Sequence, residues 1–171
     1  MEVERSFAES LNKRRIIKNE MKMEFDAISE NESFARVAVA AFVTPLNPTL
    51  EEIADIKTAV SEAVTNAIIH GYDGENELLH DEKEAKVVMR CSISDDVLSV
   101  EITDEGHGIE NIEQAMEPLF TTKPEMERSG MGFAFMEAFM DDLEVISQPG
   151  VGTTVLMKKK LGTTSWIRQE E

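Results

Sequence analysis

The stretch from Glu62 to Gly71 constrains the fold of this chain most, because it predicts one long helix with two distinct sides. Helical spacing puts the side chains of Glu62 and Asn66 within about 40° of each other around the helix axis. A carboxylate can accept a proton and a carboxamide oxygen can bind Mg²⁺, although both side chains could instead simply face water. A separate apolar stripe predicts packing against a core, and it comprises Ile53, Ile56, Val60, Ala63, Val64 and Ala67.

Composition and charge limit the partners that this chain can have. Its 171 residues suffice for one domain with a core of its own. The net charge of -17 repels nucleic acid and anionic membranes, so we expect direct binding to neither and a preference for a basic partner protein. A single cysteine, Cys91, and the absence of a signal peptide indicate a cytoplasmic protein. No apolar run reaches the roughly 20 residues that cross a bilayer.

We expect one domain at residues 21–161, with a charged N-terminal extension at 1–20 and a C-terminal tail at 162–171. Alternation predicts a strand at 21–27, and a helix follows at 32–43. Thr49 and Glu52 have the spacing of a capping box at the start of the long helix, and residues 73–84 read as a surface loop. The helix at 32–43 should bury its apolar side, which comprises Phe34, Val37, Ala38, Ala41 and Phe42.

A hairpin is predicted next, with its turn at Asp95 and Asp96. Asp104 continues the inward-facing row of the second strand, where a carboxylate is costly unless something pairs with it. Alternatively, the strand ends at Thr103 and Asp104 caps a turn, and the two interpretations are evenly matched. Cys91 reads as a buried thiol without a catalytic role. Alternation puts two apolar rows on one face of the hairpin, namely Val87, Met89, Cys91 and Ile93 with Leu98, Val100 and Ile102.

Glycines punctuate the second half of the chain. Gly106 and Gly108 precede a connection at 109–129, whose length is typical of a functional lid. Gly130 and Gly132 open another helix, where backbone N–H groups could approach an anion, or they form only a tight turn. Two final strands, near 143–145 and at 153–160, enclose a turn at 148–152.

Four of these segments, at 62–66, 104–108, 130–132 and 152–154, together resemble the nucleotide-binding motifs of the GHKL ATPases. One such motif is weak evidence, whereas four in the right order and spacing are strong evidence. Longer matches at 31–36, 61–71, 118–124 and 127–133 closely resemble the anti-sigma F factors of spore-forming bacteria, and the resemblance runs from about residue 18 to about residue 160. It implies a two-layer α/β sandwich, the Bergerat fold, with a mixed and mostly antiparallel sheet and helices on one face.

The resemblance implies a role for each matching residue. Glu62 would be the general base, and Asn66 would bind the Mg²⁺ that accompanies ATP or ADP. Asp104 would accept a hydrogen bond from adenine. The cationic side chains of Lys123 and Arg128 could reach the γ-phosphate, or they could simply be solvated. The remaining nucleotide contacts implied are Gly106, Gly108, Thr121, Thr122, Arg128, Ser129, Gly130, Met131, Gly132 and Thr154.

The resemblance also implies an activity and partners. The chain would bind and inhibit a sporulation sigma factor of the sigma F type, phosphorylate an anti-anti-sigma protein on serine with ATP, and work as a homodimer. Glu32 and Arg36 match positions that contact these partners. Two alternatives remain: a stress-response anti-sigma serine kinase of the same family, and a binding module gated by nucleotide without kinase chemistry. The ATPase module of a histidine kinase is disfavoured, because His70, His80 and His107 are poorly placed for phosphorylation.

Overall fold

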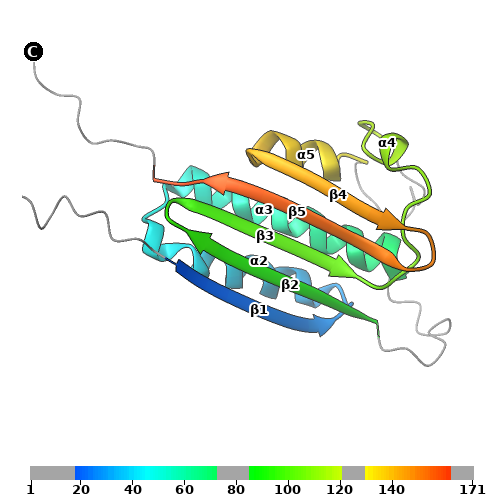
Figure 1. Ribbon diagram of the computed structural model, residues 1–171, viewed down its shortest axis with the longest axis horizontal. Coiled ribbons are helices and arrows are strands. Elements are labelled where there is room, and N and C mark those ends of the chain that lie inside the picture. The colour runs from blue at the N-terminus through cyan, green and yellow to red at the C-terminus, as the bar shows by residue number, and fades with distance from the viewer. Residues whose placement is uncertain (1–17, 73–84, 121–129, 163–171) are drawn as a thin grey trace, which may run out of the picture.

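The computed structural model describes residues 18–72, 85–120 and 130–162. A five-stranded sheet forms one layer and helices cover one of its faces, as Figure 1 shows. The strands lie in the order β1-β2-β3-β5-β4, and every described pair is antiparallel. The predicted α/β sandwich is therefore confirmed. The sheet was expected to be mixed, but none of the described strand pairs is parallel. The strands are β1 (Lys18–Asp26), β2 (Lys86–Ser94), β3 (Val97–Asp104), β4 (Asp142–Gln148) and β5 (Gly152–Lys160).

The β2–β3 hairpin forms the centre of the sheet and follows the predicted alternation. Its turn contains Asp95, whose φ of 56° lies in the left-handed region that aspartate tolerates. Both predicted apolar rows are buried. β3 does not stop at Thr103 but runs to Asp104, which is only 6% exposed and pairs with Val87 on β2. The interpretation of Asp104 as the last residue of the inward row is thus confirmed.

α3 is the central helix and packs against both α2 and α5. Its capping box is confirmed, because the Thr49 side chain accepts from the N–H of Glu52 at 3.1 Å and the Glu52 carboxylate accepts from the N–H of Thr49 at 2.7 Å. The predicted stripe faces the core, with Ile56, Val60, Ala63, Val64 and Ala67 buried. The helical elements are α2 (Glu30–Phe42), η1 (Thr44–Leu46), α3 (Leu50–Asn66), a wider turn η2 (Ala67–Gly71), α4 (Ile112–Ala115) and α5 (Gly132–Phe139).

The structure corrects two sequence predictions in the first half of the chain. α2 buries Ala35 and Val39, whereas Phe34 is 55% and Val37 63% exposed. Apolar residues surround most of this helix, so periodicity alone does not select the face that packs on α3. The strand predicted at residues 21–27 instead spans Lys18–Asp26, because β1 pairs with β2 along this whole length.

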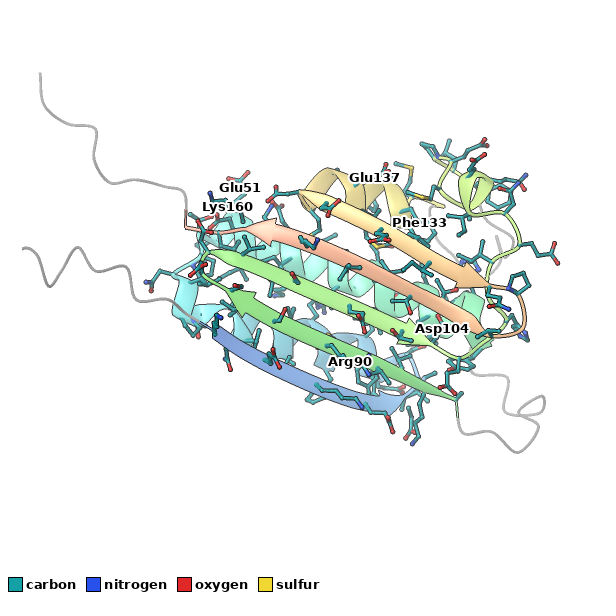
Figure 2. All side chains as sticks on the ribbon, in the orientation of Figure 1. Glu51, Arg90, Asp104, Phe133, Glu137 and Lys160 are labelled. Atoms are coloured by element: carbon teal, nitrogen blue, oxygen red, sulfur yellow. The ribbon has the colours of Figure 1, made fainter. Side chains whose placement is uncertain are left out.

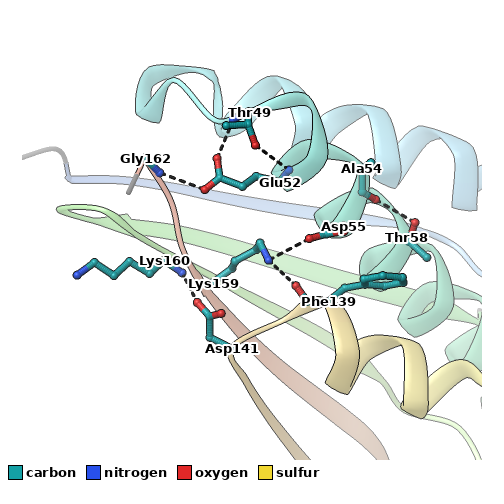
Figure 3. A network of polar contacts seen from close by, with 10 residues as sticks. All are labelled: Thr49, Glu52, Ala54, Asp55, Thr58, Phe139, Asp141, Lys159, Lys160 and Gly162. Carbon is teal, nitrogen blue, oxygen red and sulfur yellow. Dashed lines mark hydrogen bonds and ion pairs between the residues drawn. The ribbon is translucent and has the colours of Figure 1, made fainter. Parts of the chain in front are cut away.

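A polar network fastens the end of α3 that is remote from Asn66, as Figure 3 shows. Lys159 on β5 donates to Asp55 on α3 at 3.2 Å and to the carbonyl of Phe139 at the end of α5 at 2.6 Å. One side chain thereby joins the sheet to two helices and supplies a positive charge at the C-terminus of α5, where the helix dipole favours it. Among the described residues, no helix has the length and apolarity that a membrane span requires.

Candidate functional site

A pocket of about 300 Å³ lies where the ends of α3 and β3 meet the start of α5. Asp104 and Phe133, both labelled in Figure 2, contribute to its walls from the sheet and from α5. All four predicted segments reach or border this pocket, although they are far apart in the sequence. Five of the predicted site residues line it directly, namely Asn66, Asp104, Gly108, Gly130 and Gly132.

Asp104 is the buried carboxylate of the pocket. Burial raises its pKa from 3.8 to about 6, while hydrogen bonds from the backbone of Gly106 and Thr153 and the nearby charge of His107 act in the opposite direction. The N–H of Gly106 donates to its Oδ1 at 3.0 Å. A carboxylate has more acceptor capacity than these two backbone bonds use, so Asp104 can accept a further hydrogen bond from a ligand in the pocket.

Two glycines allow the end of η2 to lie against the residues that follow β3. A Cβ at Gly71 would lie 2.9 Å from Oδ1 of Asp104, and a Cβ at Gly106 would lie 2.1 Å from the carbonyl oxygen of Gly71. The N–H of His107 donates to that same carbonyl at 2.9 Å. Any larger side chain at Gly71 or Gly106 would therefore push the Asp104 turn away from the helix.

Glu62 and Asn66 meet the start of α5 at Gly132. A Cβ added to Gly132 would lie 3.2 Å from Oε2 of Glu62 and 3.2 Å from both side-chain polar atoms of Asn66. The first N–H groups of a helix lack partners within the helix, and its dipole favours an anion at this end. A carboxamide and a helix N-terminus thus meet at one end of the pocket with the Glu62 carboxylate beside them, while Asp104 lies in the pocket wall on the sheet side.

The donor atoms at this end suit a magnesium ion that arrives with a phosphate ligand. No group of three or more His, Cys, Asp or Glu side chains that could hold a metal occurs within the described ranges 18–72, 85–120 and 130–162. Mg²⁺ commonly binds through one or two protein oxygens and completes its shell with phosphates and water. The carboxamide oxygen of Asn66 fits that requirement and leaves the carboxylate of Glu62 available to accept a proton.

Comparison with known proteins identifies relatives of this chain. A family model described as a histidine kinase-like ATPase domain matches residues 26–159. The anti-sigma F factor of Clostridium perfringens is 58% identical over 146 residues, which cover 85% of this chain and 99% of that protein. The anti-sigma F factor of Bacillus subtilis is 54% identical over 145 residues, covering 85% of this chain and 94% of that protein.

The chain belongs to the anti-sigma F factor family. Another member, from Oceanobacillus iheyensis, is 54% identical over 151 residues, 88% of this chain and 99% of the relative. A solved structure of the RsbU and RsbW domains of a Mycobacterium tuberculosis protein matches with a TM-score of 0.59 at 20% identity, over 84% of this chain and 32% of that one. At this identity the likeness concerns the fold alone.

One residue predicted from the family resemblance, Thr154, lies on the wrong side of the sheet for this pocket. Its hydroxyl is 3.1 Å from that of Thr103, and neither residue lines the pocket. Thr153 lines the pocket instead, and it pairs with Asp104 across β3 and β5. Neighbouring residues of a strand face opposite sides, so an assignment that is off by one residue moves the hydroxyl to the other face.

Glu62 lies beside the pocket-lining Gly132 but is not itself among the pocket-lining residues. Met131 is the N-cap of α5 and is not among the pocket-lining residues. Gly106 borders the pocket through its bond to Asp104. Gly130 has a φ of +60°, and its carbonyl accepts from the N–H of Leu119 at 2.9 Å, which brings the two ends of the intervening connection together. The residues Thr121, Thr122, Lys123, Arg128 and Ser129, like the predicted surface loop at 73–84, lie outside the described residues.

Glu32 and Arg36, the predicted partner contacts, lie on α2 and outside the pocket lining. The carboxylate of Glu32 accepts a hydrogen bond from the hydroxyl of Ser61 on α3. Arg36 lies 3.7 Å from Glu32, and its side chain is 40% exposed. This pair is therefore connected to the residue that directly precedes Glu62.

Sequence reasoning missed several pocket residues of this family member. Gly71 was interpreted only as a helix stop, and its contact with Asp104 depends on two segments far apart in the chain. Thr153 could have been found by pairing the predicted strands, because it lies opposite Asp104. Missed pocket-lining residues that are apolar include Ile102, Ile109, Phe120, Phe133 and Val155.

Proposed function

We propose that this chain is an anti-sigma factor that binds a sporulation sigma factor of the sigma F type and uses ATP to phosphorylate an anti-anti-sigma protein on serine. The histidine kinase-like ATPase domain and the relatives named anti-sigma F factor support this function. The observation that carries the proposal is the pocket, which is lined by the buried carboxylate of Asp104 and, at the start of α5, by Asn66 and Gly132, with the carboxylate of Glu62 next to Gly132.

ATP would bind with its adenine near Asp104 and its phosphates near the start of α5. The carboxylate of Asp104 would accept a hydrogen bond from the exocyclic amine of adenine. The apolar side chains of Ile102, Phe133 and Val155 would surround the base, as apolar walls usually do in nucleotide pockets. Thr153, which lies opposite Asp104, would add a hydroxyl at the same end.

Phosphoryl transfer needs accurate positioning and charge stabilisation more than covalent chemistry from the protein. The serine hydroxyl oxygen of the substrate would form the new bond to the γ-phosphorus while the bond from that phosphorus to the ADP oxygen breaks. Glu62 would take the hydroxyl proton, and ADP would leave. When bound through Asn66, Mg²⁺ would neutralise phosphate charge. The N–H groups that begin α5 would stabilise the same anionic groups.

The protein partners would be a sigma factor, the serine-containing anti-anti-sigma protein and a second copy of this chain. The net charge of -17 favours partners with basic surfaces and disfavours direct contact with nucleic acid. Glu32 and Arg36 would contribute partner contacts on α2, where the Arg36 side chain is 40% exposed. A protein with these partners would act in the cytoplasm.

The kinase proposal is tested by transfer of labelled γ-phosphate from ATP to the anti-anti-sigma protein, with mass spectrometry to locate the phosphoserine. Glu62→Gln and Asn66→Ala should abolish transfer, whereas Glu51→Gln should not. Glu51 is a suitable control because it is an exposed glutamate on the same helix, remote from the pocket.

An unchanged transfer rate in Glu62→Gln would refute its assignment as the base. ATP-dependent sigma-factor binding by a wild-type protein that transfers no phosphate would favour the nucleotide-gated binding module. Preference for the sigma and anti-anti-sigma proteins of a stress response would favour the related kinase of that pathway.

A further inference from the structure

We propose that Tyr72 is a positioning residue for adenine recognition, because its hydroxyl holds the turn that orients Asp104. The inference rests on the proposed binding of ATP in this pocket. Tyr72 itself does not line the pocket, so it would act only through its neighbours.

The Tyr72 hydroxyl joins three parts of the fold that are distant in sequence. It donates to the carbonyl of Lys86 at the start of β2 at 2.8 Å, and it accepts from the N–H of Glu105 at 2.8 Å. Tyr72 directly follows η2, the wide turn that ends the central helix. The N–H of Glu105 belongs to the peptide group that joins Glu105 to Asp104, so this contact fixes the backbone immediately after the carboxylate.

A second contact from the adjacent residue holds the same turn. The carbonyl of Gly71 accepts from the N–H of His107 at 2.9 Å. Between these two anchors lies Gly106, whose N–H donates to Oδ1 of Asp104 at 3.0 Å. Tyr72 and Gly71 therefore hold the residues on either side of Gly106, namely Glu105 and His107. The N–H of Gly106 binds one oxygen of Asp104, and the remaining acceptor capacity of this carboxylate is left for a ligand.

The surroundings of Tyr72 favour a neutral hydroxyl that can serve both contacts. Burial raises the pKa of Tyr72 above 10.0, and the nearby negative charges of Asp104 and Glu105 raise it as well. The hydrogen bonds with the backbone of Glu105 and Lys86 lower it. A neutral tyrosine donates one hydrogen bond and accepts another, which is the pattern seen here. Wide π-type turns such as η2 occur frequently at functional sites, and this one delivers Gly71 and Tyr72 to the turn together.

Loss of the Tyr72 hydroxyl should reduce the preference for adenine over guanine more than it reduces the overall affinity for nucleotide. Adenine offers an amine to a carboxylate, whereas guanine offers a carbonyl oxygen at the corresponding position and is repelled. A site built to bond a substrate N–H discriminates strongly only while its polar group is held in place. A less constrained Asp104 turn therefore reduces the preference for adenine and leaves phosphate binding at α5 unaffected.

The test measures dissociation constants for ATP and GTP by calorimetry with Mg²⁺ in the wild type, in Tyr72→Phe and in a control, Thr49→Ala. Thr49 caps the far end of α3, so its loss lowers stability without touching the pocket. In Tyr72→Phe the ATP affinity should fall about fivefold, the size expected for one weakened hydrogen bond, while GTP affinity should change little. The control should retain the wild-type ratio of the two affinities.

Amide hydrogen exchange supplies a second measurement. The Glu105 amide should exchange faster in Tyr72→Phe, and in the wild type ATP should slow its exchange more than GTP does. An unchanged ATP-to-GTP ratio in Tyr72→Phe overturns the inference, as does an equal loss of both affinities or equal protection of Glu105 by both nucleotides. A wild-type protein that binds neither nucleotide overturns the proposed function itself.

Discussion

Replacing Asp104 by asparagine should stabilise this protein at neutral pH while weakening its binding of ATP. Asp104 is 6% exposed, and burial raises its pKa from 3.8 to about 6. At pH 7 and above the folded state must therefore keep a charge in a site that disfavours it. Asparagine has nearly the same shape and can still accept from the N–H of Gly106, but it carries no charge.

The magnitude follows from the two pKa values. A carboxyl whose pKa rises from 3.8 to about 6 on folding loses about 3 kcal/mol of stability when it ionises. Because the folded pKa is the higher one, the favourable contribution of Asp104 is complete below pH 3.8 and is lost as the pH rises through 6. This amount is a large part of the roughly 5–15 kcal/mol that stabilises a typical domain.

Urea denaturation between pH 4 and pH 8 measures the effect. We expect wild type and Asp104→Asn to be similarly stable near pH 4, and the variant to be more stable by about 3 kcal/mol at pH 8. Asp142→Asn is a matched control, because Asp142 is 62% exposed and should change stability by less than about 0.5 kcal/mol at any pH. A difference that stays constant with pH, or a variant less stable at pH 8, would refute the reasoning.

The same substitution should separate stability from function. Asp104→Asn should bind ATP more weakly at pH 8 although it unfolds at higher urea, as expected where a functional group is held at the expense of stability. In the wild type, ATP affinity should rise between pH 5 and pH 7 as Asp104 ionises. Calorimetry at these pH values checks both statements, and equal ATP affinities of wild type and variant at pH 8 would contradict them.

Three further predictions concern single residues. Thr153→Val should weaken ATP binding and Thr154→Val should not, because only Thr153 of the two lines the pocket. Calorimetry measures both ATP affinities, and a larger loss of affinity in Thr154→Val would contradict the strand register. Lys159→Met should lower the free energy of unfolding by about 1–3 kcal/mol, since it removes two hydrogen bonds at a mostly buried site, with ATP affinity unchanged. Cys91 should react with a thiol reagent only on unfolding, because burial raises its pKa to about 12; fast labelling of the folded protein would show the thiol to be accessible.

The local periodicities of this fold could be predicted from the sequence. Alternation in β2 and β3 identified the buried rows and put Asp104 in line with them, because successive side chains of a strand face opposite sides. Helical spacing put Glu62 and Asn66 one turn apart, and Thr49 with Glu52 marked the start of α3. Each of these predictions depends only on residues that are close together in the sequence, within one strand or within one or two helical turns.

Contacts between distant segments were decided only by the tertiary structure. Packing against α3 selected Ala35 and Val39 as the buried face of α2, although Phe34 is larger than either and Val37 is the same residue type as Val39. The register between β3 and β5 put Thr153 rather than its neighbour in the pocket. Such choices depend on how whole elements approach one another.

The site itself shows the same division. The sequence determined which groups are available: a carboxylate in an apolar row, a second carboxylate and a carboxamide on one helix, and glycines at the start of another helix. Their distances arise only in the folded chain, where Gly71 lies against Asp104 and Gly132 lies against Glu62 and Asn66. Backbone geometry sets short-range spacing directly, whereas close approach across the pocket depends on the packing of the sheet and helices as a whole.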